Sequence, residues 1–291
     1  MALPLLGDVR QRLAQQLFDR VAGPEGPRRR DQIHSTPGPR WFAADSAIRR
    51  VHGDASMFVG GLRALLLQSL HPLAMAGVAA HSGFEGDPWG RLQRTSYFLA
   101  ITTFGAATDA EAMLARIRSI HARVNGIAAD GRPYSASDPH LLKWVHLAEI
   151  DSFLSAHQRY GQRPLDGSGR DAYVAETARV AEALGVVDAP RSVAQMRAQL
   201  QVYRPELAGT PEARSAARFM LLNPPLPLAA RPAYGVLAAA AVSLLPAWSR
   251  RPLRLPHLPV TEAFAVRPAG AGLTRTIRWA LTQPATDPAA S

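Results

Sequence analysis

The sequence predicts an all-α protein in which about ten helices form a single domain. Apolar residues recur every three or four positions along most of the 291 residues, and no stretch shows sustained alternation of apolar and polar residues. Several of these stretches begin or end at typical helix caps. No internal repeat and no linker divides the chain, and a hydrophobic content of 47% is enough for one sizeable core.

The first half of the chain predicts four helices. A stripe of Val9, Leu13, Leu17 and Val21 indicates a helix over 8–22, which ends at the breaker GPEGPRRRD. We assign residues 1–30 to this N-terminal helix and its linker, and 31–283 to the main domain. Within that domain we expect a long apolar helix over 56–81, another over 88–104 and a third over 109–125. Thr108 with Glu111 forms a capping-box pattern for the third, and Asn125-Gly126 is a typical stop.

The second half continues in the same way. ADGRPYSASDPH is hairpin-like, and Asp138-Pro139 then begins a helix that runs to about Tyr160. The remaining helices are expected over 168–184 with Gly185 as terminator, over 192–202 with a Ser192/Gln195 capping box, and over 211–222, 233–248 and 271–283. Residues 284–291, a proline- and alanine-rich tail, should be disordered.

Composition excludes several classes of function. The net charge of +10 comes from arginines scattered along the chain, whereas a nucleic-acid surface would concentrate them on one element. The chain has no cysteine, so disulfides, iron–sulfur clusters and thiolate-ligated haem are excluded. The N-terminus lacks the pattern of a secretory signal, and we expect a cytoplasmic protein. A helix from Pro232 to Trp248 could make peripheral contact with a membrane.

Two arginines and a threonine stand together at the start of the helix predicted over 88–104. Arg91, Arg94 and Thr95 lie at i, i+3 and i+4, so they share a helix face, which apolar residues continue. The simplest interpretation is an amphipathic helix whose arginines reach water with their tips. The alternative is the wall of a pocket that binds an anionic or oxygen-containing group.

His121 is the histidine that favours the second interpretation. It falls four residues after Ile117 and three before Val124, on the apolar stripe of the helix predicted over 109–125. A single inward histidine is often a core residue held by hydrogen bonds. Together with the arginine face, however, it would suit a haem, because imidazole can ligate iron while guanidinium groups pair with propionates or polarise bound oxygen.

A rival site is the pair His146 and Glu149, at i and i+3 of the helix over 139–160. Such pairs occur in carboxylate-bridged di-iron sites of helical bundles. His71, His81 and His157 are the available partners, but the helices supply few further inward carboxylates. A buried polar network around Trp144 accounts for the pair equally well.

Four segments in this order resemble a known family: GGLRALLLQSLHPLAMAGVAAHSGF, DPWGRLQRTSYFLAITTFG, RIRSIHARVNG and DGRPYSASDPHLLKWVH. Together they are similar to the catalytic domain shared by bacterial latex-clearing protein, a rubber oxygenase, and the fungal ER-bound oxygenase MpaB. The resemblance is strong over about residues 40–160 and looser over the rest. It implies a globin-like helical domain that holds haem b.

The resemblance also implies roles for single residues. His121 would be the proximal ligand of the haem iron, and Arg91 and Thr95 match the R-x-x-x-T motif of the pocket. Arg94 stands where rubber-cleaving members have a lysine, so the environment of the open iron position would differ. The acidic residue thought to act as a base in rubber oxygenases has no clear counterpart, although Glu85 and Asp87 lie upstream.

We therefore expect a haem b-dependent oxygenase or dehydrogenase that acts with O2 on an apolar, isoprenoid or lipid-like molecule. Arg91, Arg94 and Thr95 would be its catalytic residues, and His121 would bind the haem iron. Two alternatives remain open at this point. One is a haem carrier or sensor without turnover, and the other is a non-haem di-iron enzyme that uses His146 and Glu149.

Overall fold

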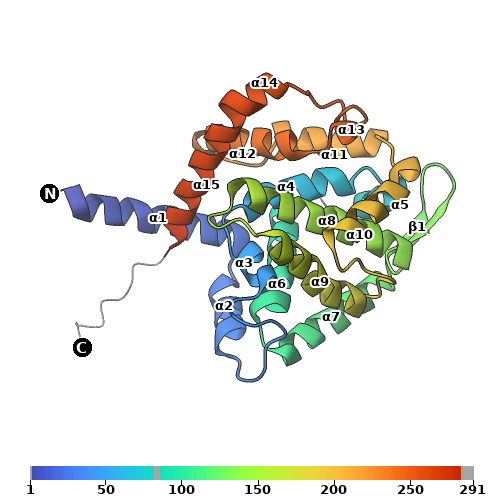
Figure 1. Ribbon diagram of the computed structural model, residues 1–291, viewed down its shortest axis with the longest axis horizontal. Coiled ribbons are helices and arrows are strands. Elements are labelled where there is room, and N and C mark those ends of the chain that lie inside the picture. Colours follow the sequence, from blue (N-terminus) through green and yellow to red (C-terminus); the bar gives the residue numbers. More distant parts are fainter. Residues whose placement is uncertain (1, 82–85, 283–291) are drawn as a thin grey trace.

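The computed structural model describes residues 2–81 and 86–282 (Figure 1). The prediction of an all-α fold is confirmed, because the described chain is mostly helical and twelve of its helices have seven or more residues. The tail expected to be disordered and the acidic residue Glu85 lie outside the described residues.

Two helices form the centre of the molecule, α4 (Met57–Gln68) and α8 (Pro139–Tyr160). Gly60 lets them approach closely, since a Cβ there would lie only 3.0 Å from Cδ1 of Phe153. Leu66 of α4 and Trp144 and Leu147 of α8 are fully buried between them. Around this pair pack α3 (Ala47–His52), α9 (Gly167–Leu184), α12 (Arg231–Leu244) and α15 (Arg267–Leu281) (Figure 1).

The apolar stretch 56–81 is two helices, so the prediction of one long helix is wrong. The chain bends by 108° between α4 and α5 (Pro72–His81). Pro72 has no N–H to continue the helical hydrogen bonds, and the chain therefore turns at His71. Within the described chain no single helix has the length and apolarity of a membrane span, and this bent pair reaches them only when counted together.

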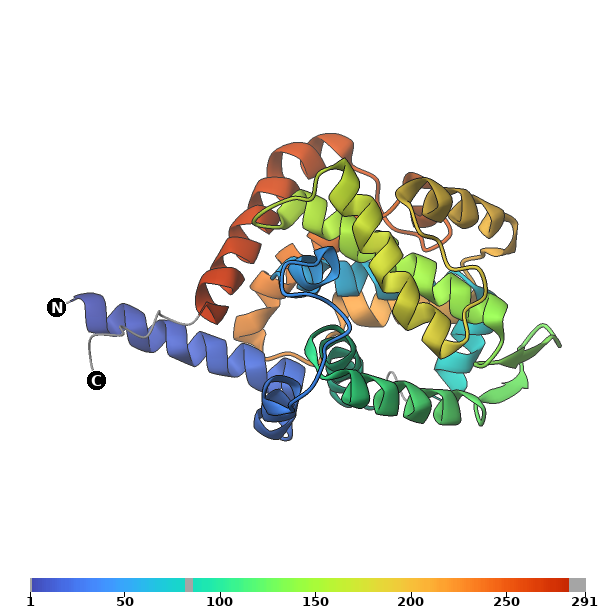
Figure 2. The ribbon, with the colours of Figure 1, turned by 60° about the horizontal axis from the view of Figure 1, so that its bottom comes forward.

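α6 (Pro88–Phe104) and α7 (Ala107–His121) follow, and they pack against each other on one side of the central pair (Figure 2). Asp87 caps α6, as its carboxylate accepts the N–H of Gly90 at 2.9 Å. The predicted limits of α7 are wrong at both ends. Thr108 lies inside its first turn and makes no cap, and the helix ends at His121 instead of Asn125.

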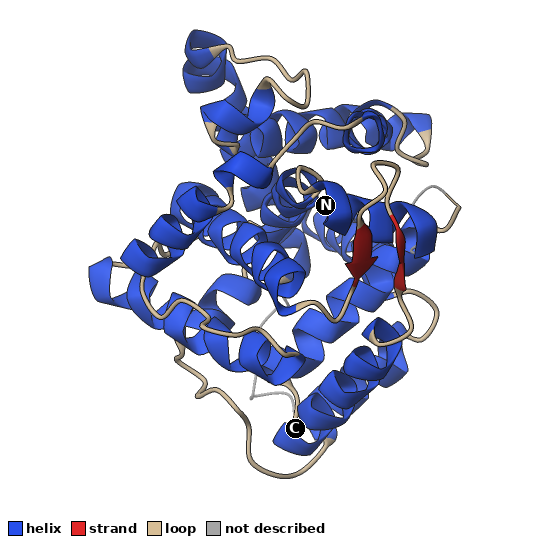
Figure 3. Cartoon of the chain, turned by 90° about the vertical axis from the view of Figure 1, so that its right-hand side faces the viewer, coloured by secondary structure: helices blue, strands red, loops and turns tan. Residues whose placement is uncertain are grey.

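Asn125 begins a short hairpin, after tight turns at Arg123 and Val124, whose N–H groups donate to the carbonyls of Ile120 and His121. Strands β1 (Asn125–Ile127) and β2 (Pro133–Ser135) pair antiparallel, with Gly126 opposite Tyr134 (Figure 3). The hairpin-like character read from the sequence is thus confirmed. Asp138 then caps α8 by accepting the N–H of His140, and α8 ends at Tyr160 as expected.

The later helices largely follow the predicted limits. Gly185 ends α9 with φ of 108°, and Ser192 caps α10 (Val193–Val202) by accepting the N–H of Gln195. The helix predicted over 233–248 is interrupted, because α12 ends at Leu244 and Pro246 precedes α13. The remaining elements are α1 (Ala2–Ala22), α2 (Gly26–Ser35), η1 (Arg204–Glu206), α11 (Pro211–Leu222), η2 (Leu228–Ala230), α13 (Ala247–Arg250), α14 (Pro259–Thr261) and the π-helical η3 (Glu262–Val266).

α12 is the helix for which the sequence suggested membrane contact. Ala238, Ala240 and Ala241 are buried, and the helix packs against α4, α8 and α15. Much of its apolar face is therefore used for the core of this chain.

Candidate functional site

The arginine helix α6 presents its three candidate residues in different environments. Arg91 is half-buried, and burial lowers the pKa of its guanidinium, an effect to which the charge of Arg94 adds. Arg94 and Thr95 are exposed, and Nη1 of Arg94 lies 3.1 Å from a carboxylate oxygen of Asp87. Arg91 is thus the member of the set that lies deepest in the protein.

His121 is the last residue of α7. Its ring is half-buried, and its Nδ1 is buried with no hydrogen-bond partner in the part of the chain that the structure describes. Burial lowers the pKa of the imidazole, so the ring is neutral at pH 7. A neutral imidazole that is not committed to a structural hydrogen bond can act as a metal ligand.

His146 and Glu149 lie one turn apart on α8, as the spacing predicted. Burial lowers the pKa of His146 to about 4 and raises the pKa of Glu149 to about 7. His146 is therefore neutral at pH 7, and Glu149 is partly protonated. Within the described chain no third histidine or acidic side chain completes a metal-binding group with them.

Two of the three histidines that could have joined this pair have other neighbours, whereas Nδ1 of the third, His157, is buried without a hydrogen-bond partner among the described residues. Nε2 of His71 lies 3.3 Å from Glu206, and Nε2 of His81 lies 3.2 Å from the hydroxyl of Tyr134. Trp144 donates to the carbonyl of Gln68, so the structure gives it a backbone partner. The described residues do not support a di-iron site at His146 and Glu149.

A buried chain of polar contacts lies beside Glu149 and was missed in the sequence. Nδ1 of His52 lies 2.8 Å from the hydroxyl of Thr103, and its Nε2 lies 3.3 Å from the hydroxyl of Tyr173. Burial lowers the pKa of His52 to about 3. Burial raises the pKa of Tyr173, and the negative charges of Glu149 and Asp151 add to this. These contacts join α3, α6 and α9, whose sequences carry no motif that relates the three residues.

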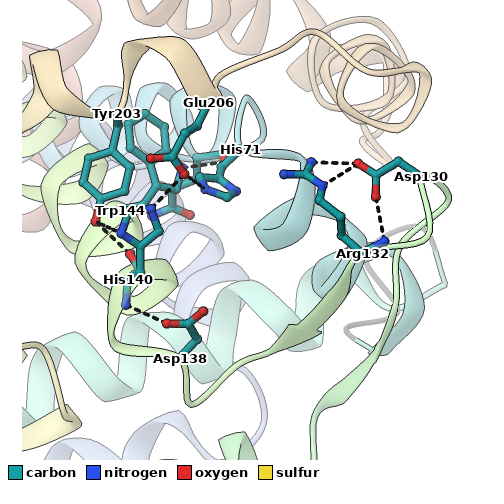
Figure 4. Close-up of polar contacts among 9 residues, drawn as sticks. His71, Asp130, Arg132, Asp138, His140, Trp144, Tyr203 and Glu206 are labelled. Atoms are coloured by element: carbon teal, nitrogen blue, oxygen red, sulfur yellow. Dashed lines mark hydrogen bonds and ion pairs between the residues drawn. The ribbon is translucent and has the colours of Figure 1, made fainter.

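A second cluster lies at the bend between α4 and α5 (Figure 4). Nε2 of His71 and Nε2 of His140 both face the same carboxylate oxygen of Glu206, at 3.3 and 2.8 Å. His71 is buried, whereas His140 and Glu206 are partly exposed. The three side chains offer ligand atoms within 4.8 Å of one another, an arrangement that could hold a metal ion.

This second cluster was also missed in the sequence. His71, His140 and Glu206 come from the α4–α5 bend, the first turn of α8 and η1, so their spacing along the chain is irregular. The one local signal was the predicted start of α8 at Asp138-Pro139, which places His140 at an exposed helix end.

The sequence profile of a protein family matches residues 49–279, which include every candidate residue described above. The family is described as ER-bound oxygenase mpaB/B'/Rubber oxygenase, catalytic domain. The chain belongs to this family. No curated protein and no solved structure gives a significant match.

Membership of the mpaB and rubber oxygenase family indicates that the chain is an oxygenase and that it acts with O2 on a substrate. The family resemblance noted in the sequence is therefore confirmed. α1 and α2 precede the matched region, and α6, α7 and α8, with the arginine face, His121 and Glu149, lie within it.

Proposed function

We propose that this chain is a haem b-dependent oxygenase that acts on an apolar, isoprenoid or lipid-like substrate, with His121 as the axial ligand of the iron. The observation that carries the proposal is the state of His121. Its ring is neutral, half-buried and without a hydrogen-bond partner among the described residues. No hydrogen bond to the described residues commits the ring to a structural role, so its Nε2 is available to a bound group.

The chemistry of the available ligands agrees with haem b. The chain has no cysteine, so thiolate ligation is excluded and histidine is the natural axial ligand. The Nε2 of His121 would hold the iron, with the ring proton on Nδ1. In such sites a carbonyl or carboxylate usually accepts that proton. The described residues supply no such acceptor, so we expect a weaker imidazole donor than in a site where one is present.

Arg91, Arg94 and Thr95 have separate roles in this proposal. Arg91, half-buried at the start of α6, would pair with a haem propionate or orient an oxygen species. Thr95 would donate a hydroxyl hydrogen bond on the same face. Arg94 would have to leave Asp87 to reach the pocket, and it would therefore serve at the entrance.

When bound, haem supplies O2 activation and one-electron chemistry. The protein would supply proton transfer. Glu149 is suited to hold or accept a proton because burial raises its pKa to about 7, and it lies beside the chain formed by Tyr173, His52 and Thr103. It is our candidate for the base that the sequence did not identify.

The visible spectrum of the protein tests the cofactor and its ligand. Wild type, His121→Ala and the control His34→Ala, which changes an exposed histidine of α2, are expressed with ample haem. We expect a Soret band in wild type and His34→Ala and its loss or shift in His121→Ala. A wild type without a Soret band would contradict the haem proposal, and an unchanged spectrum in His121→Ala would contradict the ligand assignment.

Turnover separates an oxygenase from a carrier or sensor. The haem-loaded protein is incubated with unsaturated lipids and isoprenoids under O2, and products are measured by mass spectrometry. We expect consumption of an apolar substrate, with a lower rate in Arg91→Ala. Stable O2 binding with no product from any of these substrates would favour the carrier.

A further inference from the structure

We propose that His71, His140 and Glu206 form a binding site for one divalent transition-metal ion, of which Zn²⁺ is the best fit. The site is separate from His121 and does not depend on the haem proposal. Its ligand atoms would be Nε2 of each histidine and one carboxylate oxygen of Glu206 (Figure 4).

The spacing of the three atoms suits a tetrahedral ion. Two ligand atoms at about 2.1 Å from zinc lie about 3.4 Å apart. The carboxylate oxygen lies 3.3 Å from Nε2 of His71 and 2.8 Å from Nε2 of His140. The exposed His140 would have to move about half an ångström away from the carboxylate to reach this spacing. One ring nitrogen of each histidine and the carboxylate oxygen already lie within 4.8 Å of one another.

The hydrogen bonds of His140 favour a cation between it and Glu206. Tyr203 donates its hydroxyl proton to the carbonyl of His140 at 2.9 Å, so that hydroxyl is left as an acceptor for Nδ1 of the same residue at 3.3 Å. In the neutral ring this places the proton on Nδ1 and the lone pair of Nε2 toward the carboxylate. Two acceptors 2.8 Å apart repel each other unless a proton or a metal ion lies between them.

The donor set selects the class of metal. Two imidazoles and one carboxylate suit Zn²⁺ and related transition metals, whereas Mg²⁺ and Ca²⁺ prefer oxygen ligands. Three protein ligands leave a fourth position for water. Tyr203 acts as a positioning residue, because it fixes the tautomer and the orientation of His140.

Binding would join three segments that are distant in the sequence. His71 lies at the α4–α5 bend, His140 in the first turn of α8 and Glu206 in η1. Nδ1 of His71 has no partner among the described residues, so only His140 has an outer hydrogen bond. We therefore expect a site of moderate affinity that raises the thermal stability of the protein.

The experiment measures Zn²⁺ binding to chelator-treated, haem-free protein by competition with a chromophoric zinc indicator, together with the melting temperature. Wild type should bind one Zn²⁺ and melt at a higher temperature with the ion. His140→Ala and Glu206→Gln alter partly exposed side chains and should fold. Each should lose at least about 100-fold in affinity, and Tyr203→Phe about 10- to 100-fold.

Two controls make the test specific. His34→Ala removes an exposed histidine elsewhere, and His121→Ala removes the proposed haem ligand; both should bind Zn²⁺ like wild type. Excess Mg²⁺ should not displace the ion. No zinc-dependent rise in melting temperature in wild type, or equal zinc affinity in wild type and His140→Ala, would overturn the proposal. Zinc binding by a protein that shows no Soret band would contradict the haem proposal but not the zinc proposal.

Discussion

Arg63 between the central helices and His121 in the candidate oxygenase site are polar residues in opposite situations. Between α4 and α8, the guanidinium of Arg63 is buried and each of its nitrogens has a partner: Asp151 at 2.7 Å, Ser152 at 2.6 Å and the carbonyl of Leu244 at 2.9 Å. In the candidate site, by contrast, Nδ1 of His121 is buried without a partner among the described residues.

This difference separates structural polar groups from groups that are available for chemistry. A buried charge is tolerated when hydrogen bonds and an opposite charge compensate its desolvation, and Arg63 meets that condition. An unpaired imidazole contributes little to the fold and costs free energy. The comparison therefore predicts large stability losses at Arg63 and small losses or gains at the candidate site.

The largest effect is expected for Arg63→Ala. It leaves the carboxylate of Asp151, whose side chain is 17% exposed, without its cation, and it removes the donor to Leu244. We expect a loss of about 3–5 kcal/mol in the free energy of unfolding, measured by urea denaturation. Arg28→Ala, which breaks the exposed pair with Glu25, is the matched control and should change little. Equal losses of unfolding free energy in Arg63→Ala and Arg28→Ala would contradict the structural role of Arg63.

The next effect is a gain in stability for Glu149→Gln. Burial raises the pKa of Glu149 from an ordinary value of 4.5 to about 7, so the folded protein retains a proton that the unfolded chain releases between these values. Wild type therefore loses stability from this group as the pH rises from 4.5 to 7. The glutamine variant avoids this loss, and above pH 7 it should be more stable by about 3 kcal/mol.

Thermal melts of wild type and Glu149→Gln at pH 5 and pH 8 measure this effect. The difference between the two proteins should be larger at pH 8. Glu111→Gln, on the exposed surface of α7, is the control and should show no such dependence. A difference that is larger at pH 5 would contradict the raised pKa of Glu149.

A smaller effect is expected for His121→Ala in haem-free protein. The ring makes no hydrogen bond with the described residues, so its removal should cost only about 1 kcal/mol of packing. The unfolding free energy and the haem spectrum are measured on the same preparations. A loss as large as that of Arg63→Ala would show that His121 is a structural residue and would weaken its proposed role.

The smallest effect is expected for Arg94→Ala. Its side chain and that of Asp87 are 61% and 59% exposed, and exposed ion pairs contribute almost nothing to stability. We expect an unchanged melting temperature together with altered turnover in the haem-loaded protein. Arg94→Lys, which introduces the residue found in rubber-cleaving members, tests whether charge at this position is sufficient. A clear fall in melting temperature would place Arg94 among the structural residues.

Local signals in the sequence predicted most helix limits because those limits depend on neighbouring residues. Helix ends are set by nearby hydrogen bonds at Asp138-Pro139 and at the Ser192/Gln195 pair, and by backbone conformation at Gly185. Other predicted limits were wrong. The capping-box pattern at Thr108 is unused because α7 already begins at Ala107. Similarly, Pro72 divides a stretch whose apolar periodicity alone predicted one helix.

The sequence by itself determined the all-helical class, the family and the identity of His121 and of the His146/Glu149 pair as candidates, because periodicity and ordered motifs are properties of adjacent residues. Tertiary structure decided which polar groups are paired. Three sets of contacts join residues between 51 and 135 positions apart. They are the contact of Arg63 with Asp151, the contacts of His52 with Thr103 and Tyr173, and the cluster of His71, His140 and Glu206. Such pairings depend on how helices pack in space, and no spacing along the chain encodes them.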